Sequence, residues 1–149
     1  MKSMIHERVA GARAGTNPTV ICKMPSGWAV MADIQLLPGY TILLHDPVVP
    51  DLNSLNEKQR TRYLLDMVII GDALMEVTGA YRINYEVLCN TDPFLHGHVF
   101  PRYMSEPEHL RRVPAWAYER EGPLPLNKFD AERDKELMQK IAKAIKKRI

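Results

Sequence analysis

Residues 95–102 read Leu-His-Gly-His-Val-Phe-Pro-Arg, and this stretch decides the predicted fold. Histidines and apolar residues alternate in it, as in a half-buried β-strand whose side chains point to opposite faces in turn. His96 and His98 therefore lie on one face, and the residues between and around them lie on the other. Pro101 is tolerated because it stands near the end of the strand. The stretch predicts a strand that presents two imidazoles on one side of a sheet.

A long amphipathic helix is predicted upstream, over residues 57–78. Asn56 is a good N-cap, Gln59 follows three residues on as in a capping box, and Gly79 supplies the C-terminal stop. Apolar residues recur at steps of four and three along one face, which we expect to pack on a sheet: Tyr63, Met67, Ile70, Leu74 and Val77. A second set widens this apolar stripe: Leu64, Val68, Gly71 and Met75.

Short β-rich segments lie on both sides of this helix. Residues 19–23 and 28–31 flank a Met-Pro-Ser-Gly turn and predict a hairpin, and residues 40–44 predict a further strand. After the helix, residues 82–89 alternate as a strand with one polar face. The segments together predict an antiparallel sheet.

The last third of the chain has a different pattern. Residues 103–129 contain four prolines and few periodic signals, so we expect an irregular arm. A final helix is predicted from about Ala131, burying Leu137, Ile141, Ala144 and Ile145. The fold class is therefore α+β: residues 1–149 form one domain, with the long helix packed across the sheet and the C-terminal helix beside it.

Composition excludes several classes of protein. Twenty basic and eighteen acidic side chains give a net charge of +2, too small to indicate a nucleic-acid partner. The last ten residues contain five basic side chains and no acidic one, and acidic side chains gather just before them. Acids near the start and bases near the end of a helix complement its dipole, which is typical of a solvated helix. No apolar stretch approaches the roughly 20 residues of a membrane span, and the start lacks a signal-peptide segment. Cys22 and Cys89 are too few for a disulfide framework. We expect a cytoplasmic protein without membrane contact.

The strand with the two histidines resembles the signature of the histidine triad (HIT) superfamily. In that signature histidines alternate with apolar residues and are followed by two apolar residues, often then by Pro-Arg. Residues 32–34, 38–44 and 51–52 resemble earlier segments of the family in order and approximate spacing. The resemblance spans about Val20 to Arg102 and leaves the rest of the chain outside it. It implies a HIT-like fold and a homodimer.

The resemblance also implies an activity. Members of the family are nucleotide hydrolases or nucleotidyl transferases that act at the phosphate next to a nucleoside, in dinucleoside polyphosphates, nucleoside phosphoramidates or other adenosine phosphate conjugates. His96 aligns with the nucleophile, whose ring a backbone carbonyl orients. A neutral imidazole can attack phosphorus, and the covalent nucleotidyl-histidine intermediate divides one displacement into two easier ones. No metal or cofactor is then required.

Four further residues receive supporting roles from the resemblance. His98 is the first candidate for a donor to a phosphate oxygen or a proton shuttle to the leaving group. Asn90 lies where members often carry a phosphate-contacting Gln or Ser, although an asparagine there also suits a turn. Asn84 resembles the family's Asn or Gln near the phosphate, with a one-residue gap. Asp33 resembles the acid that accepts hydrogen bonds from the ribose hydroxyls.

Two positions depart from the family pattern. Phe94 stands where the first histidine of the signature should be, and Tyr40 stands where many members have a histidine after Pro-Gly. We expect these two side chains to pack as an aromatic pair that supports the strand. The departures make a catalytically weak nucleotide-binding module of the same fold the first alternative. Arg102, which ends the signature, is expected to pair at the surface and to have no catalytic role.

A metal site is the second alternative. His96 and His98 would be two ligands, with a third from His45, His109 or Glu86. Spacing places no third ligand, and a metal-binding barrel would not contain a long amphipathic helix between its strands. The sequence therefore favours the covalent mechanism over a metal site.

Overall fold

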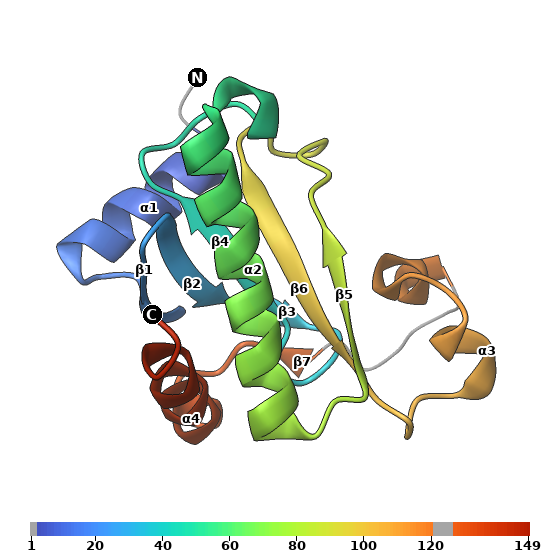
Figure 1. Cartoon of the computed structure of the whole chain (residues 1–149). Coiled ribbons are helices and arrows are strands. Elements are labelled where there is room, and N and C mark those ends of the chain that lie inside the picture. Colours follow the sequence, from blue (N-terminus) through green and yellow to red (C-terminus); the bar gives the residue numbers. More distant parts are fainter. Residues whose placement is uncertain (1–2, 121–126) are drawn as a thin grey trace.

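A five-stranded antiparallel sheet forms the centre of the protein (Figure 1). The computed structural model describes residues 3–120 and 127–149. The strand order is β1-β2-β4-β6-β5, and every neighbouring pair is antiparallel. The strands are β1 (Val20–Met24), β2 (Gly27–Met31), β4 (Thr41–His45), β5 (Arg82–Glu86) and β6 (His96–Arg102). Two short strands, β3 (Ile34–Gln35) and β7 (Asn127–Lys128), pair separately. The predicted α+β class with an antiparallel sheet is confirmed.

Helix α2 (Glu57–Thr78) crosses one face of the sheet with the predicted bounds. The Asn56 side chain accepts from the Gln59 backbone N–H at 2.9 Å, and the Gln59 side chain accepts from the Asn56 N–H at 3.1 Å. Gly79 ends the helix with φ of 70°, a left-handed conformation that glycine adopts without steric cost. A short 3-10 helix, η1 (Leu52–Ser54), precedes it. The capping signals therefore define both ends of α2.

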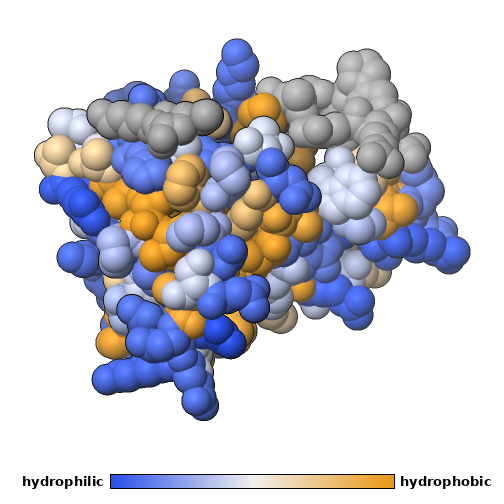
Figure 2. Space-filling view, turned by 90° about the horizontal axis from the view of Figure 1, so that it is seen from above, coloured by the Kyte–Doolittle hydropathy of each residue, from blue (hydrophilic) through white to orange (hydrophobic). Residues whose placement is uncertain are grey.

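The face of α2 toward the sheet is narrower than the sequence predicts. Tyr63, Ile70 and Leu74 are fully buried, as expected for the first apolar set. The second set was expected to widen the buried stripe, but the side chains of Leu64, Val68 and Met75 are 44%, 45% and 42% exposed. They lie outside the part of the helix that the sheet covers, and they leave a row of apolar side chains on the surface of the helix. Hydrophobic surface is also seen from above, where it gathers in the middle of the view with hydrophilic side chains around it (Figure 2).

The other face of the sheet is partly covered by a helix that the sequence analysis did not predict. Helix α1 (Met4–Ala14) starts after Ser3, whose hydroxyl caps the His6 N–H, and ends at Gly15. Ile5 and Val9 pack against Val30 and Leu44 of the sheet. Its apolar residues are few and weakly periodic, so the sequence gives little helical signal.

Helix α4 (Lys135–Lys146) lies beside α2 on the same side of the sheet (Figure 1). It starts four residues later than predicted, because residues 131–134 form a turn that precedes the helix. Ile141, Ala144 and Ile145 are buried as expected, and Leu137 is half-buried. The described part of the chain has no helix long and apolar enough to cross a membrane.

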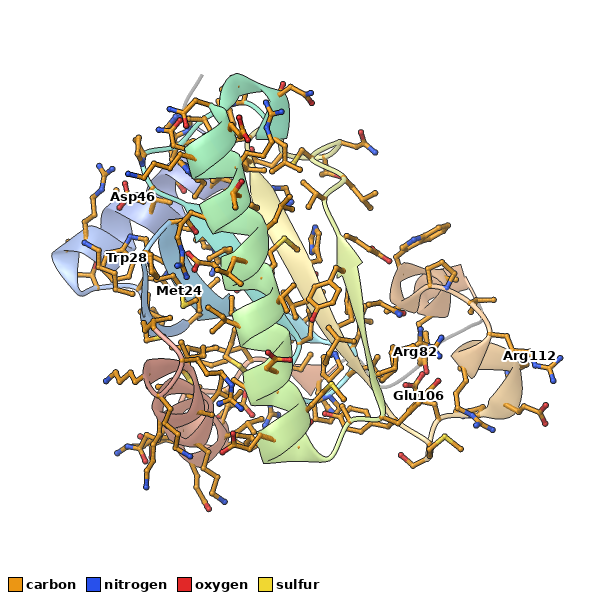
Figure 3. All side chains as sticks on the ribbon, viewed as in Figure 1. Met24, Trp28, Asp46, Arg82, Glu106 and Arg112 are labelled. Atoms are coloured by element: carbon orange, nitrogen blue, oxygen red, sulfur yellow. The ribbon has the colours of Figure 1, made fainter. Side chains whose placement is uncertain are left out.

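The arm after β6 contains short ordered elements, α3 (Glu108–Arg111) and η2 (Ala115–Arg120), where an irregular segment was expected. The surface position expected for Arg102 is wrong: the residue is 2% exposed. Its guanidinium donates to the Glu106 carboxylate at 2.9 Å and to the carbonyls of Leu110 and Val113 at 2.7 and 2.8 Å. Figure 3 labels Glu106 between the sheet and the short helices of the arm. The guanidinium of Arg102 has five N–H donors in a fixed planar arrangement, so this one side chain can join the arm to the sheet.

Candidate active site

A pocket with a volume of about 670 Å³ opens on the face of the sheet opposite α2. Its lining includes both signature histidines, with side chains from β3, β4, β5, the 88–91 segment and the arm. The alternation predicted for β6 places Leu95 and Val99 in the core and leaves the histidines half-buried on the pocket side. Gly97, between the histidines, faces α2, where an added Cβ would lie 2.7 Å from Met67 Cε. The strand therefore fits closely against the helix.

The ring of His96 is oriented by the backbone. Its Nδ1 lies 2.7 Å from the carbonyl oxygen of Phe94. A carbonyl can only accept a hydrogen bond, so Nδ1 carries the proton. In the neutral ring the proton-free nitrogen is then Nε2, which keeps its lone pair for attack on an electrophile.

His98 lies next to His96 and contacts two aromatic rings. The imidazole centroids are 4.9 Å apart at 74°, and His98 stacks on Phe100. The Tyr40 hydroxyl lies 2.5 Å from His98 Nδ1, and the Tyr40 ring stacks on Phe100 at 4.0 Å. Burial, and then the neighbouring His96, lower the pKa of His98 to about 4. His98 is therefore neutral at pH 7 and holds one N–H for donation.

We expect this low pKa to make the folded state sensitive to acid. Between pH 6.5 and about 4, the unfolded chain binds a proton at His98 and the folded protein does not, so stability falls as the pH falls through this window. His98→Gln should remove that part of the loss, at most about 3 kcal/mol. Urea unfolding at pH 7 and pH 4.5 measures it for wild type and variant. The exposed His109→Gln variant is the control, and an equal acid loss in all three proteins would contradict the prediction.

The aromatic pair predicted between Phe94 and Tyr40 is absent. Phe94 instead packs edge-on against His6 of α1, with ring centroids 4.5 Å apart. Phe94 lies two residues before β6, and its side chain turns toward α1. The N–H of Leu95, between Phe94 and the strand, donates to the Val49 carbonyl. Tyr40 instead contacts His98 and Phe100.

The three other predicted site residues have different positions. Asn90 lines the pocket, in the segment after β5. Asp33 also lines it, with a half-exposed carboxylate that forms an ion pair with Arg8 of α1. Asn84 lies outside it, because its side-chain oxygen accepts from Arg102 Nη1 at 2.6 Å beside the arm. This placement does not support the predicted phosphate contact of Asn84.

Sequence reasoning assigned no role in nucleotide chemistry to Glu86 or Trp116, which line the same pocket. Glu86 is paired with His98 across β5 and β6, and burial raises the pKa of its carboxyl. The polar face predicted for residues 82–89 is the signal that indicates this position. Trp116 comes from η2, and no pattern in the arm distinguishes it from a surface residue.

The third ligand proposed for a metal site is not assembled among the described residues. His45 is buried on the other face of β4, beside Tyr63, and its Nδ1 contacts the Pro47 carbonyl at 2.7 Å. His109 lies on α3 in the arm. No group of three or more His, Cys, Asp or Glu in this part of the chain is arranged to hold a metal ion.

Comparison of the sequence with models of known families and with curated proteins finds no match. Solved structures do match the fold. A histidine triad protein from Marinobacter aquaeolei VT8 is 22% identical, with a TM-score of 0.72 over 95% of each chain. A hypothetical histidine triad nucleotide-binding protein from Sulfolobus tokodaii strain7 gives 0.72 at 10% identity, over 95% of this chain and 92% of that one. A Zn-bound histidine triad family protein from Mycobacterium smegmatis gives 0.67 at 14% identity, over 93% and 94%.

These likenesses define the class of fold. The chain has the α+β fold of histidine triad proteins, with His96 and His98 on the interior strand β6. The fold extends beyond the part of the sequence that carries the signature, since the matched regions include most of the chain.

Proposed function

We propose that the protein is a nucleotide hydrolase or nucleotidyl transferase in which His96 attacks the phosphate next to a nucleoside. The contact between His96 Nδ1 and the Phe94 carbonyl carries the proposal, because it leaves Nε2 as the unprotonated nitrogen. His96 also lines a pocket whose volume is typical of small-molecule sites.

The reaction has two displacements. In the first, Nε2 forms a bond to phosphorus, the bond from phosphorus to the leaving group breaks, and the leaving group departs with the electron pair. The ring acquires positive charge while Nδ1 keeps its proton, and the Phe94 carbonyl stabilises that charge. In the second, water or another acceptor bonds to phosphorus and gives up its proton to solvent or to the departed leaving group, the P–N bond breaks with its electron pair returning to Nε2, and neutral His96 is restored. His98 and Asn90 are the donors available to the phosphate oxygens.

The nucleoside would occupy the other end of the pocket. Asp33 supplies a carboxylate that accepts hydrogen bonds from ribose hydroxyls. Ile34, Ile42 and Trp116 provide apolar and aromatic surface there for a base. None of these side chains selects one base. We propose dinucleoside polyphosphates and nucleoside phosphoramidates as the substrate class, because both contain a phosphate next to a nucleoside.

Trapping of the intermediate tests this proposal. The protein is mixed with adenosine 5′-phosphoramidate or diadenosine tetraphosphate and quenched in alkali, since phosphoramidates are labile in acid. Peptide mapping by mass spectrometry should find adenylate on His96. Nucleotide binding without an adduct or turnover would instead support the binding module. Turnover that stops after exhaustive chelation and returns with a transition metal would support the metal site.

Phe94 offers a test of the orienting carbonyl. We expect Phe94→His and Phe94→Leu to change kcat less than about threefold, because every residue at this position retains the carbonyl that His96 contacts. Both variants should lower the melting temperature, since the ring packs on His6. Steady-state kinetics on adenosine 5′-phosphoramidate measures the first effect. A gain of about 10²-fold for Phe94→His would show that the missing imidazole acts in proton transfer.

We also propose that two copies form a homodimer through α2 and β5. The exposed apolar row of α2 lies on the side of β5, whose Tyr85 ring lies against Gly71. Within residues 3–120 and 127–149, strand β5 pairs only with β6, and no strand of this part of the chain pairs with its other edge. An open edge beside exposed apolar side chains is a surface that proteins usually cover.

Val68→Glu should convert this dimer into a monomer, because it places a charge in the centre of the apolar row. Size-exclusion chromatography with light scattering measures the mass. Met4→Glu is the matched control, since it adds the same charge to an exposed apolar residue of α1. A wild-type protein that is monomeric at 100 µM, or a Val68→Glu variant that stays dimeric, would contradict the proposal.

The two cysteines accord with a cytoplasmic location, which we propose for this protein. Cys22 and Cys89 are both free thiols. Burial raises the pKa of Cys22 to about 11, so this residue is an unreactive part of the core. Free thiols are typical of proteins in a reducing compartment.

A further inference from the structure

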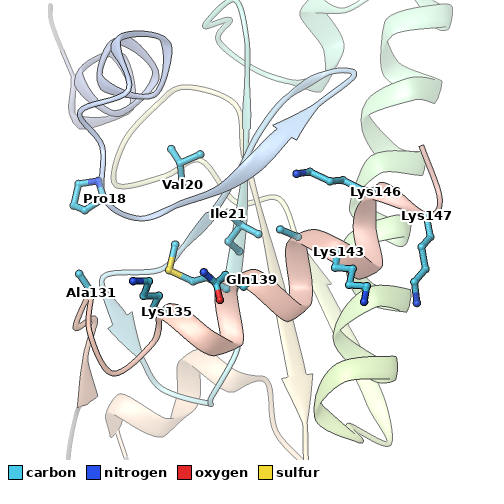
Figure 4. Close-up of a pocket in the computed structure, with 11 residues that line it drawn as sticks. Pro18, Val20, Ile21, Ala131, Lys135, Gln139, Lys143, Lys146 and Lys147 are labelled. Carbon is cyan, nitrogen blue, oxygen red and sulfur yellow. The ribbon is translucent and has the colours of Figure 1, made fainter.

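A second cavity lies far from the histidines in the fold, between β1 and α4 (Figure 4). Its volume is about 740 Å³, and it shares no lining residue with the pocket of His96. Half-buried apolar side chains form its floor: Val20 and Ile21 from β1, and Met138 and Ala142 from α4. This β1–α4 groove takes no part in the chemistry proposed above.

Positive charge surrounds the groove. Lys135, Lys143, Lys146 and Lys147 line it, and no acidic side chain of the described residues does. Lys147 shares Glu76 with Arg148, whereas no described carboxylate lies within 4 Å of the other three lysine nitrogens. The acid of α4, Glu136, pairs instead with Lys140, which does not line the groove. The dipole of α4 explains basic residues in its last turn, but not the position of Lys135 in its first.

The groove lies beside an open sheet edge. Among the strands that the structure describes, only β2 pairs with β1, and no residue of β2 lines the groove. The groove therefore lies on the side of β1 where backbone groups have no strand partner. A bulge between Val20 and Cys22 interrupts the pairing with β2 at Ile21. Open edges of this kind accept an extended peptide as an added strand.

The dimensions agree with such a peptide. Lys135 and Lys146 are eleven residues apart, which is about 16 Å along a helix. An extended chain covers that distance in about five residues, the length of β1. We propose that the β1–α4 groove binds an acidic, extended peptide segment of a partner protein, with apolar side chains on the floor and carboxylates at the lysines.

Two other anionic ligands fit the groove less well. The described residues of its lining include no aromatic side chain on which the bases of a single-stranded nucleic acid would stack. The apolar residues of α4 face the floor and the protein core, so no apolar face is left to enter a membrane.

Fluorescence anisotropy tests the proposal with a labelled octapeptide that alternates glutamate and valine. The double variant Lys143→Gln/Lys146→Gln should weaken its binding about tenfold at low salt, because two ion pairs are lost. Lys140→Gln is the matched control on the same helix and should change the affinity less than twofold. His96→Ala should bind the peptide as wild type does, which separates this result from the proposed catalysis.

Two modified peptides test the mode of binding. A peptide with glutamine in place of glutamate should bind at least tenfold more weakly, since it lacks the charges. A peptide with alternate backbone nitrogens methylated should also bind at least tenfold more weakly, since it cannot pair with β1. Equal binding of the methylated peptide, no loss in the lysine double variant, or lysine-dependent binding only to phosphatidylserine vesicles or single-stranded DNA would each overturn the proposal.

Discussion

We expect His96→Ala to lower kcat/KM for nucleotide cleavage at least about 10³-fold, because no other side chain replaces the nucleophile. The measurement is the hydrolysis of adenosine 5′-phosphoramidate at saturating and at low substrate. His96 is half-buried on the pocket side of β6 and contributes little to the core, so the melting temperature should change by only a few degrees.

Two controls make this result specific to the nucleophile. His109→Ala removes a histidine from the exposed face of α3 and should leave the rate unchanged. The alkaline quench should show no adenylate on the His96→Ala protein. Undiminished hydrolysis by that variant would exclude the covalent mechanism.

Arg102→Ala should have the largest effect on stability, about 3–5 kcal/mol, because it leaves the buried carboxylate of Glu106 without its positively charged partner. The two side chains are only 3% and 4% exposed. The change also leaves the Val113 carbonyl without its donor and removes one of the donors to the Leu110 carbonyl. Urea unfolding followed by circular dichroism gives the free energy of unfolding.

The chain provides a matched ion pair for comparison. Arg112 and Glu108 are also four residues apart, but their side chains are 76% and 69% exposed. Arg112→Ala should therefore cost less than about 1 kcal/mol. Equal losses in Arg102→Ala and Arg112→Ala would show that burial of the first pair adds nothing to the attachment of the arm.

Periodicity and capping residues predict those elements whose ends depend on local hydrogen bonds. The bounds of α2 follow from Asn56, Gln59 and Gly79, which form local hydrogen bonds and a local turn. The faces of the helix are less predictable, because the width of the buried stripe depends on which neighbours pack against it. Leu64 and Val68 have the residue types of a core, but neither the sheet nor α4 covers them.

The arm shows why tertiary contacts are harder to predict. Arg102 is a common surface residue type, and nothing local indicates that α3 and the following turn would surround it. In the site, alternation along β6 is sufficient to place His96 and His98 on one face. Glu86 and Asn84 lie on the same polar face of β5, but whether each lines the pocket depends on the arm, which binds Asn84 through Arg102.

Gly97 connects the site to the interior of the protein. It separates the two histidines, and a side chain there would meet Met67 and the hydroxyl of Tyr63, which itself bonds to the Leu43 carbonyl. A larger residue would require the end of the Met67 side chain to move or β6 to shift away from α2, and a shift of β6 would change the tilt of both imidazoles together. The positions of the two imidazoles thus depend on α2, which packs on the other face of β6 and lines no part of the pocket. Mutations in the core of α2 would reach the two rings through the backbone of β6.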